Sequence, residues 1–330
     1  MARAPTDTGR SRRPLLEPWM GWTPSPEQQP SEAPGAVHSP RTASIAMRAA
    51  SRFILRAYLA GTDGSGGDAL TAFVLVALVD ANIGHVDADP ILSRRYAAFD
   101  QVPPDGFKRP TSTRALAARL GLPYETTRRR VERLVGAGLC VRTPAGIHAP
   151  HLARAEYRNG SEANFKAVRT LLRDLHAGAP DMDWPALDRF AGPDPLPWRL
   201  VSRRASAFGI DFGSRVTELT GGYDETITYL ALVEATGAAD DAEPRRYVQT
   251  LPLARSIQQP TASVRRRLAR LEARGLVTRG PAGHTASPAP AAEDRVARLN
   301  QESLLLLRDL FGQILRLWPT PQGGGERPVP

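Results

Sequence analysis

The stretch LAARLGLPYETTRRRVERLVGAGLCVRTPAG, residues 116–146, recurs as LARSIQQPTASVRRRLARLEARGLVTRGPAG at residues 253–283. At a constant offset of 137 residues, without a gap, 14 of the 31 positions are identical. Unrelated segments of this composition would share only about two or three positions, so the chain contains an internal repeat. Each copy has three consecutive arginines, Arg128–Arg130 and Arg265–Arg267. The repeat therefore places a basic cluster at the same point of both copies.

The repeat extends beyond this motif on both sides. Upstream, LVALVD at 75–80 matches YLALVE at 229–234, and downstream LLRDL occurs at both 171–175 and 306–310. The offset between the copies changes around residues 97–112, where the first copy has an insertion rich in proline and glycine, which is typical of a loop. We therefore expect two units of one plan: a helix, a short extended piece, two helices, a hairpin and a final helix.

Composition divides the rest of the chain. Residues 1–45 are rich in proline, serine, arginine and glycine without a hydrophobic period, which predicts a disordered tail, and residues 319–330 have the same character. A stretch rich in proline and aspartate, 179–197, predicts a linker. The first repeat unit then covers 46–178 and the second 198–318. A chain of 330 residues is long enough for two packed domains of ordinary size.

Local signals predict the elements of the first copy of the motif. A short helix over 113–120 is ended by Gly121, because glycine readily adopts the left-handed backbone of a helix end. Pro123 opens the next helix, where its missing N–H costs nothing, and Gly138 ends that helix as a left-handed cap. The sequence TPAG at 143–146 then predicts the turn of a hairpin.

The second copy has the same signals with one exception. A helix over 253–257, an opening Pro260 and a closing Gly275 match their counterparts, but Gln258 replaces the turn glycine Gly121. A non-glycine residue there must either tolerate a left-handed backbone or use a different turn.

Two further signals concern the helices around the motif. Asp68 and Asp224 are the expected N-caps of the first helix in each unit, because an aspartate oxygen accepts from the free N–H groups of a first turn. The helix that carries the arginines has an apolar stripe with i, i+4, i+7 spacing, which predicts its buried face. The stripe consists of Thr127, Val131 and Leu134 in the first copy and Val264, Leu268 and Leu271 in the second.

The positive charge of the chain is concentrated in the two copies. The net charge is +9, and residues 109–158 contribute +7 and residues 253–279 contribute +6, while all remaining residues sum to −4. A positive field confined to a repeated short helix and turn is typical of a protein that binds the phosphates of a double-stranded nucleic acid.

The order helix, helix, turn, helix, hairpin resembles a winged helix-turn-helix motif. In particular, the pattern LxxLGLPYETTRRRVERLVxAGL, with the small Ala117 four residues before Gly121, is similar to bacterial regulators of the MarR, IclR and cyclic-AMP-receptor types. The resemblance covers the quoted stretch of each copy. It implies a mainly α fold with small β-wings, in which tandem duplicated winged helix-turn-helix units with flanking helices pack as an intrachain pseudo-dimer.

The resemblance also implies a DNA-contacting surface. In such a fold the third helix lies in the major groove and its N-terminal residues meet base edges. Arginine suits this surface, because its planar guanidinium can donate two hydrogen bonds to guanine or to a phosphate. The expected DNA-binding residues are Tyr124, Glu125, Arg128, Arg129, Arg133 and Arg142 in the first copy, and Thr261, Arg265, Arg266, Arg270 and Arg279 in the second.

Other interpretations of these residues stay open at this stage. The arginine triplets are also compatible with a solvated helix face or a protein-binding face. Glu125 has Arg129 four residues away, so the two could pair without contacting a base, and Tyr124 could pack against the turn. Arg130 and Arg267 stand where the resembled families have apolar residues, so we expect their stems to pass the core with the charged ends at the surface.

The function implied by the resemblance is a cytoplasmic, nucleoid-associated transcriptional regulator that binds double-stranded DNA. A plasmid replication initiator or partition protein is one alternative, and a winged-helix scaffold for protein–protein interaction in chromosome organisation is another. The helices after the wings, 161–176 and 301–318, are the expected contacts of a homodimer. The sequence indicates no effector.

The sequence gives no sign of an enzyme, a metal site or a membrane protein. No nucleophile–base pair, phosphate loop or carboxylate pair stands out, so we expect no catalytic residue and no cofactor. His148 and His151 lack further ligands at metal-binding spacing. The single cysteine, Cys140, excludes an intrachain disulfide and is expected to be a small buried hydrophobe. The apolar run 69–79 is too short to span a bilayer, and no signal peptide is visible.

Overall fold

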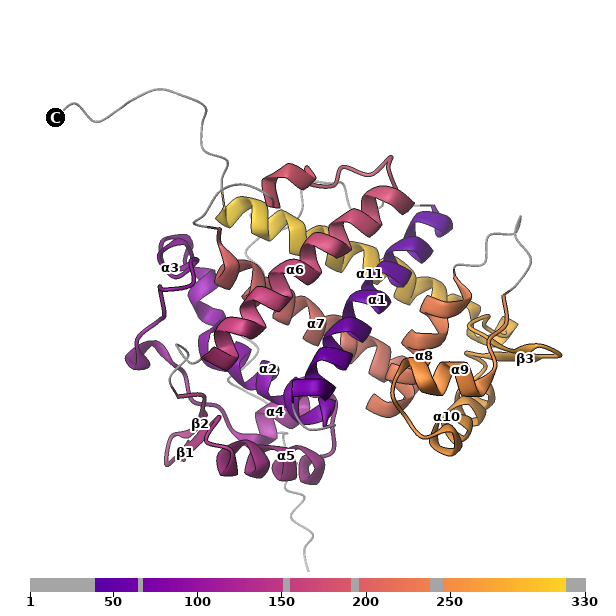
Figure 1. The fold of residues 1–330 in the computed structure, drawn as a ribbon, viewed down its shortest axis with the longest axis horizontal. Helices are drawn as coiled ribbons and strands as arrows, with labels where there is room; N and C mark the ends of the chain where they lie inside the picture. The colour runs from indigo at the N-terminus through magenta and orange to yellow at the C-terminus, as the bar shows by residue number, and fades with distance from the viewer. Residues whose placement is uncertain (1–38, 65–67, 151–154, 191–195, 238–245, 319–330) are drawn as a thin grey trace, which may run out of the picture. The chain divides into compact units, whose positions relative to one another are not determined.

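The computed structural model describes residues 39–64, 68–150, 155–190, 196–237 and 246–318 (Figure 1). The described residues are mostly helical, with 72% of them in helices, and they also form two small antiparallel sheets of two strands each. This confirms the predicted fold class at the level of a mainly α chain with two β-hairpins. The described residues belong to one compact unit.

The first half of the chain contains the helices and strands from α1 to α6. In order, they are α1 (Pro40–Gly64), α2 (Ala69–Ile83), the 3-10 helix η2 (Gly84–Ala88), α3 (Pro90–Arg95), the 3-10 helix η3 (Asp105–Phe107), α4 (Thr113–Leu120), α5 (Tyr124–Gly136), β1 (Val141–Thr143), β2 (Gly146–His148) and α6 (Ala155–Gly178).

Within the described residues, the second half has the same order of α-helices and strands, without counterparts of η2, α3 and η3. It contains the 3-10 helix η4 (Leu187–Phe190), α7 (Trp198–Thr220), α8 (Tyr223–Thr236), α9 (Thr250–Ser256), α10 (Thr261–Ala273), β3 (Thr278–Gly280), β4 (Gly283–Thr285) and α11 (Pro290–Leu317).

The ends of these helices follow most of the local signals. The Asp68 side chain caps α2 and accepts from the backbone N–H of Thr71 at 3.2 Å. The matching expectation for Asp224 was wrong: Gly222 is the N-cap of α8, and Asp224 lies inside the first turn. There its charge complements the helix dipole instead of capping a free N–H. The turn after α4 is left-handed at Gly121, with φ +62°, and Gln258 adopts the same region with φ +53°. The second copy therefore keeps the turn without glycine.

The hairpins are attached to the preceding chain in the same way in both halves. Thr111 forms an antiparallel bridge with Ile147, and Val248 forms one with His284. In each pair the backbone N–H of one residue donates to the carbonyl of the other in both directions. The two bridges lie at the repeat offset of 137 residues, so the duplication extends to individual backbone hydrogen bonds.

A side chain near the end of the second helix also holds each hairpin. The fully buried Asn82 side chain accepts from the backbone N–H of Ala149 at 2.9 Å, and its amide donates to the carbonyls of Arg109 and Ile147. In the other half, the Thr236 hydroxyl accepts from the N–H of the residue equivalent to Ala149, Ala286, at 3.4 Å. The same contact is therefore made by a shorter side chain with fewer hydrogen bonds.

The long helices pack reciprocally across the two halves (Figure 1). Helix α1 packs against α2 and α6 of its own half and against α8 and α11 of the other half. Helix α7 correspondingly packs against α8 and α11 of its own half and against α2 and α6 of the other half. Such exchange of equivalent contacts is the property of a two-fold interface.

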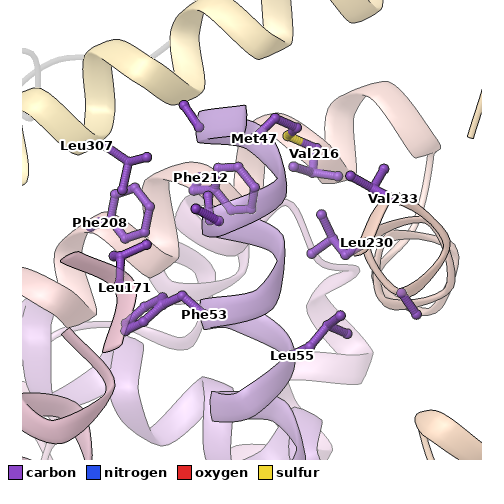
Figure 2. Close-up of a cluster of buried hydrophobic side chains, with 14 of the residues drawn as sticks. Met47, Phe53, Leu55, Leu171, Phe208, Phe212, Val216, Leu230, Val233 and Leu307 are labelled. Carbon is purple, nitrogen blue, oxygen red and sulfur yellow. The ribbon is translucent and has the colours of Figure 1, made fainter. Parts of the chain in front are cut away.

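The two halves share one hydrophobic core. Phe53 of α1 and Phe208 of α7 lie with their ring centroids 5.8 Å apart, and Figure 2 shows Leu171 of α6 and Leu307 of α11 in the same buried cluster. A smaller cluster lies under the first hairpin and includes Ile147. The predicted units are therefore not separate bodies, because aromatic and aliphatic side chains of both halves interdigitate between them.

The structure adds detail to the predicted connection between the halves and to the end of the predicted first tail. In the stretch 179–197, Trp184 and Phe190 are buried, and the Trp184 indole donates to the carbonyl of Ala179 at 3.0 Å. Two large aromatic side chains provide enough apolar surface to hold the segment on the core. Helix α1 begins at Pro40, within the predicted tail 1–45, and Ala43 is already buried. Residues 1–38 and 319–330 lie outside the described residues.

Among the described residues, one helical stretch is long and apolar enough by composition to cross a membrane. It runs from Ala69 to Ala88, so it is longer than the apolar run noted in the sequence. Its Val74, Ala77 and Leu78 side chains are completely buried in the protein, and a core helix passes the same test. The stretch is therefore weak evidence for a membrane.

Candidate nucleic-acid interface

Helix α5 is held in place by its apolar stripe. Thr127, Val131 and Leu134 are buried, as the spacing predicts, and α5 packs against α2 and α4 through this face. The equivalent stripe of α10 is also buried. Since the stripe fixes the rotation of each helix, the arginines on the other side face away from the core.

In the first copy, Glu125 binds two of the expected DNA-contacting arginines. Its carboxylate accepts from Arg128 Nε and Nη2 at 2.8 and 2.7 Å and from Arg129 Nε at 3.1 Å. Arg128 also donates to Glu132. Hydrogen bonds from Arg128 and then Arg129 lower the pKa of Glu125 to about 2. The structure thus contains the pairing of Glu125 with Arg129 that the sequence left open as an alternative.

The next two arginines of α5 reach back to the start of α2. Arg130 and Arg133 both donate to the carboxylate of Asp68, the residue that caps α2. Burial alone would raise the pKa of Asp68, but hydrogen bonds from Thr71 and the two guanidinium charges lower it. Arg130 therefore passes the core as expected, and its charged end is bound by a carboxylate.

The second copy makes the same attachment with different acids. Arg267 pairs with Asp224 at 2.8 Å, and Arg270 pairs with Glu225 at 2.7 Å. Both carboxylates lie in the first turn of α8, the counterpart of α2. Two arginines per copy, including Arg133 and Arg270 of the predicted site, thus join the arginine-bearing helix to the helix before it.

The remaining two arginines of α10 are in a different state from their counterparts. Arg265 and Arg266 are exposed, and neither forms an ion pair or hydrogen bond within the described residues. The position of Glu125 is occupied by Ala262, so no carboxylate is available there. Thr261, also part of the predicted site, is the first residue of α10.

Each hairpin presents one exposed arginine beside its helix. Arg142 on β1 lies opposite Ile147, and Arg279 on β3 lies opposite His284. Because side chains alternate along a strand, the exposed arginine and the residues before and after it point to opposite faces.

A polar cleft connects the first hairpin with the start of α4 and α5. Its volume is about 420 Å³, and Arg114, Tyr124 and Arg142 are among the residues that line it. Tyr124 is 53% exposed, so it does not simply pack against the turn. Arg114 was not predicted; its position just after the Ser112 cap of α4 is the signal that could have indicated it.

The described residues include the single cysteine, Cys140. Burial raises the pKa of the Cys140 thiol to about 11, so this cysteine has the environment of a core residue. In the part of the chain that the structure describes, no group of three or more His, Cys, Asp or Glu side chains could hold a metal ion. His151 lies outside the described residues.

Each copy thus has exposed arginines on its arginine-bearing helix and on the hairpin that follows it, a combination suited to a polyanion. No family model, curated protein or solved structure matches this chain.

Proposed function

We propose that this chain is a sequence-specific transcriptional regulator that binds double-stranded DNA with two winged helix-turn-helix motifs. The motifs are α4–α5–β1–β2 and α9–α10–β3–β4. The observation that carries the proposal is the duplicated placement of exposed arginines, on a helix whose opposite face is buried and on the hairpin beside it. The proposed setting is the bacterial cytoplasm, on the nucleoid.

The proposed contacts follow from the docking geometry of such motifs. The helix after the turn enters the major groove with its N-terminal residues toward the base edges. Tyr124, Glu125 and Arg129 of α5 and Thr261 and Arg266 of α10 would therefore face bases. Glutamate can accept from the amino group of cytosine, and arginine can donate to guanine.

Phosphate contacts would come from the flanks and the hairpins. Arg128 and Arg265 lie on the flanks of their helices, and Arg142 and Arg279 lie on the wings. Phosphate contacts carry no sequence information, but they set the register of the protein on the duplex and most of its salt dependence. Arg133 and Arg270 have a smaller part in this proposal than the sequence indicated, because each already pairs with a carboxylate of the preceding helix.

The reciprocal packing of α1 and α7 supports an intrachain pseudo-dimer. One chain would then offer two recognition helices, as an ordinary homodimer does. Since Tyr124 and Glu125 correspond to Thr261 and Ala262, the half-sites should differ. We expect an imperfect palindrome whose half-site centres are about 34–36 Å apart, which is one turn of DNA.

The helices predicted for homodimer contact are largely used within the chain. Leu304, Leu307 and Leu310 of α11 are buried, and this helix packs against α1 and α7. Leu305 is the exposed leucine of this run, at 53%. We therefore propose that the monomer already contains the paired arrangement, and homodimerisation stays a prediction.

In-vitro selection from a random double-stranded DNA pool tests the proposal, with the intact chain at physiological salt. We expect enrichment of a motif with two unequal half-sites. A variant with Arg128, Arg129, Arg265 and Arg266 all changed to alanine is the control, and it should enrich nothing while unfolding at the same temperature. No enrichment by the unmodified chain would contradict the proposal and favour a protein partner, whereas enrichment of direct repeats would favour a replication initiator.

A further inference from the structure

The two arginine-bearing helices differ at the two positions that decide how their arginines are paired. Glu125 and Glu132 flank Arg128 in α5, at three residues before it and four residues after it. Both glutamates accept hydrogen bonds from Arg128. The equivalent positions of α10 are Ala262 and Ala269, so Arg265 has no acid at either place.

We propose that Glu125 and Glu132 make α5 the more selective of the two helices, while α10 contributes more of the affinity for any duplex. This inference rests on the proposed function. We call Glu125 and Glu132 the α5 carboxylates. They bind all three side-chain nitrogens of Arg128 but only Nε of Arg129, so Arg128 must leave its ion pairs before its guanidinium can turn to a phosphate or a base.

On a random duplex the α5 carboxylates oppose binding in two ways. Arg128 must lose its carboxylate partners before its guanidinium can pair with a phosphate. The released carboxylates then lie close to the negative backbone, where like charges repel. The gain from phosphate contact is therefore largely offset on α5.

At a DNA sequence that matches α5, the released carboxylate gains a new hydrogen-bond partner. A cytosine or adenine amino group in the major groove can donate to Glu125, so the carboxylate exchanges one set of donors for another. Arg128 and Arg129 are then free to bind guanine or phosphate while Glu125 keeps a partner. Only a base with such a donor completes this exchange, which makes Glu125 a specificity-determining residue.

Hydrogen bonds from Arg128 and Arg129 lower the pKa of Glu125 to about 2. The carboxylate therefore stays charged at any physiological pH, so an exchange of hydrogen-bond partners, and not protonation, releases the arginines.

Helix α10 has the opposite character. Arg265 and Arg266 are exposed and make no ion pair or hydrogen bond within the described residues. Nothing has to be broken before they approach a phosphate. Their contribution should be salt-sensitive and should depend less on sequence than that of α5.

A reciprocal exchange between the two copies tests the inference. One variant combines Glu125→Ala with Glu132→Ala, and the other combines Ala262→Glu with Ala269→Glu. Affinity is measured at several salt concentrations for a duplex from the selection and for a random duplex of equal length. Removal of two distant carboxylates, Asp188→Ala with Asp294→Ala, controls for net charge, because both are exposed and lie outside the motifs.

Removing the α5 carboxylates should raise affinity for the random duplex about tenfold. It should steepen the salt dependence by about one to two units of slope, as expected for one or two added phosphate contacts. The ratio of the affinity for the selected duplex to the affinity for the random duplex should fall about tenfold. Installing carboxylates on α10 should lower affinity for both duplexes about tenfold and flatten the slope, and the charge control should leave the ratio unchanged.

Two results would overturn the inference. One is an unchanged ratio of selected to random affinity when the α5 carboxylates are removed, and the other is an equal fall of that ratio in the charge control. The failure of the proposed function has a different signature: the unmodified chain would then show no salt-dependent binding to either duplex.

Discussion

Helices α5 and α10 occupy the same place in the two copies, yet only α5 carries carboxylates on both sides of its exposed arginine. The shared features are those that position the helix: the buried stripe, the left-handed turn before it and the attachment of two arginines to the preceding helix. The different features lie on the outward face. Fold constraints therefore act on one side of each helix, and the other side is free to diverge.

The largest effect is expected where the two halves are joined. The Asp87 carboxylate is completely buried and accepts from Arg203 and Arg204 of α7 and from the Ser93 hydroxyl. Asp87→Ala would remove the carboxylate shared by two guanidinium groups at the interface between the copies and leave them with neutral acceptors only. We expect the free energy of unfolding to fall by about 3–5 kcal/mol in urea denaturation.

The exposed Asp188 provides the matched control, since Asp188→Ala should change stability by less than about 0.5 kcal/mol.

The Asp87 network also predicts the response to acid. Burial raises the pKa of Asp87, but Arg203 and the other donors outweigh it and lower the pKa below its ordinary value. The stabilisation that ionised Asp87 gives to the folded chain is thus complete above about pH 4, and it is lost as the pH falls through the lowered pKa of Asp87. Equal losses for Asp87→Ala and Asp188→Ala would contradict this account.

The next test compares the two hairpin turns. Gly146 and Gly283 both have φ +133°, and a Cβ at either would collide with the backbone of Thr111 or Val248. Gly146→Ala and Gly283→Ala should each lower the free energy of unfolding by about 1–3 kcal/mol. Losses of similar size would support equivalent hairpins, and a neutral substitution in one copy would show that the hairpins differ in solution.

A smaller effect is expected at the turn before each arginine-bearing helix. Gln258 has the left-handed backbone that Gly121 has in the first copy. Gln258→Gly should stabilise the chain by about 1 kcal/mol, and Gly121→Ala should destabilise it by a similar amount. Thermal melts of both variants measure this, and a destabilising Gln258→Gly would mean that the two turns are not equivalent.

The smallest effect concerns the charge state of α5. Its Glu125 carboxylate should titrate near pH 2, while an ordinary glutamate titrates near 4.5. Because the pKa is lowered, the pairing with Arg128 and Arg129 persists through mild acid and is lost only as the pH falls toward 2. Carboxyl-carbon NMR of the intact chain follows this titration directly. A midpoint above 4 would show that the ion pairs do not persist in solution.

The sequence predicts best those features that depend on neighbouring residues. The turn at Gly121 and the buried Val131 and Leu134 follow from local periodicity and backbone preference. The hairpin turns follow in the same way from the repeated Pro-Ala-Gly.

Features that depend on distant contacts could not be predicted. The pairing of Arg130 with Asp68 joins residues 62 positions apart, and no local pattern indicates it. Trp184 and Phe190 lie in a stretch whose composition is that of a linker, but the core of both halves provides a surface for them. Asp224 is not the cap because α8 begins at Tyr223 and Gly222 is its N-cap.

Hydroxyl-radical footprinting of a selected duplex with the intact chain tests the central claim most directly, namely that both copies bind one DNA molecule. The account predicts two protected regions about one helical turn apart. Removal of Arg265 and Arg266 should weaken protection of one region more than the other. Protection of a single region that is unaffected by changes in α10, or no protection at all, would contradict it.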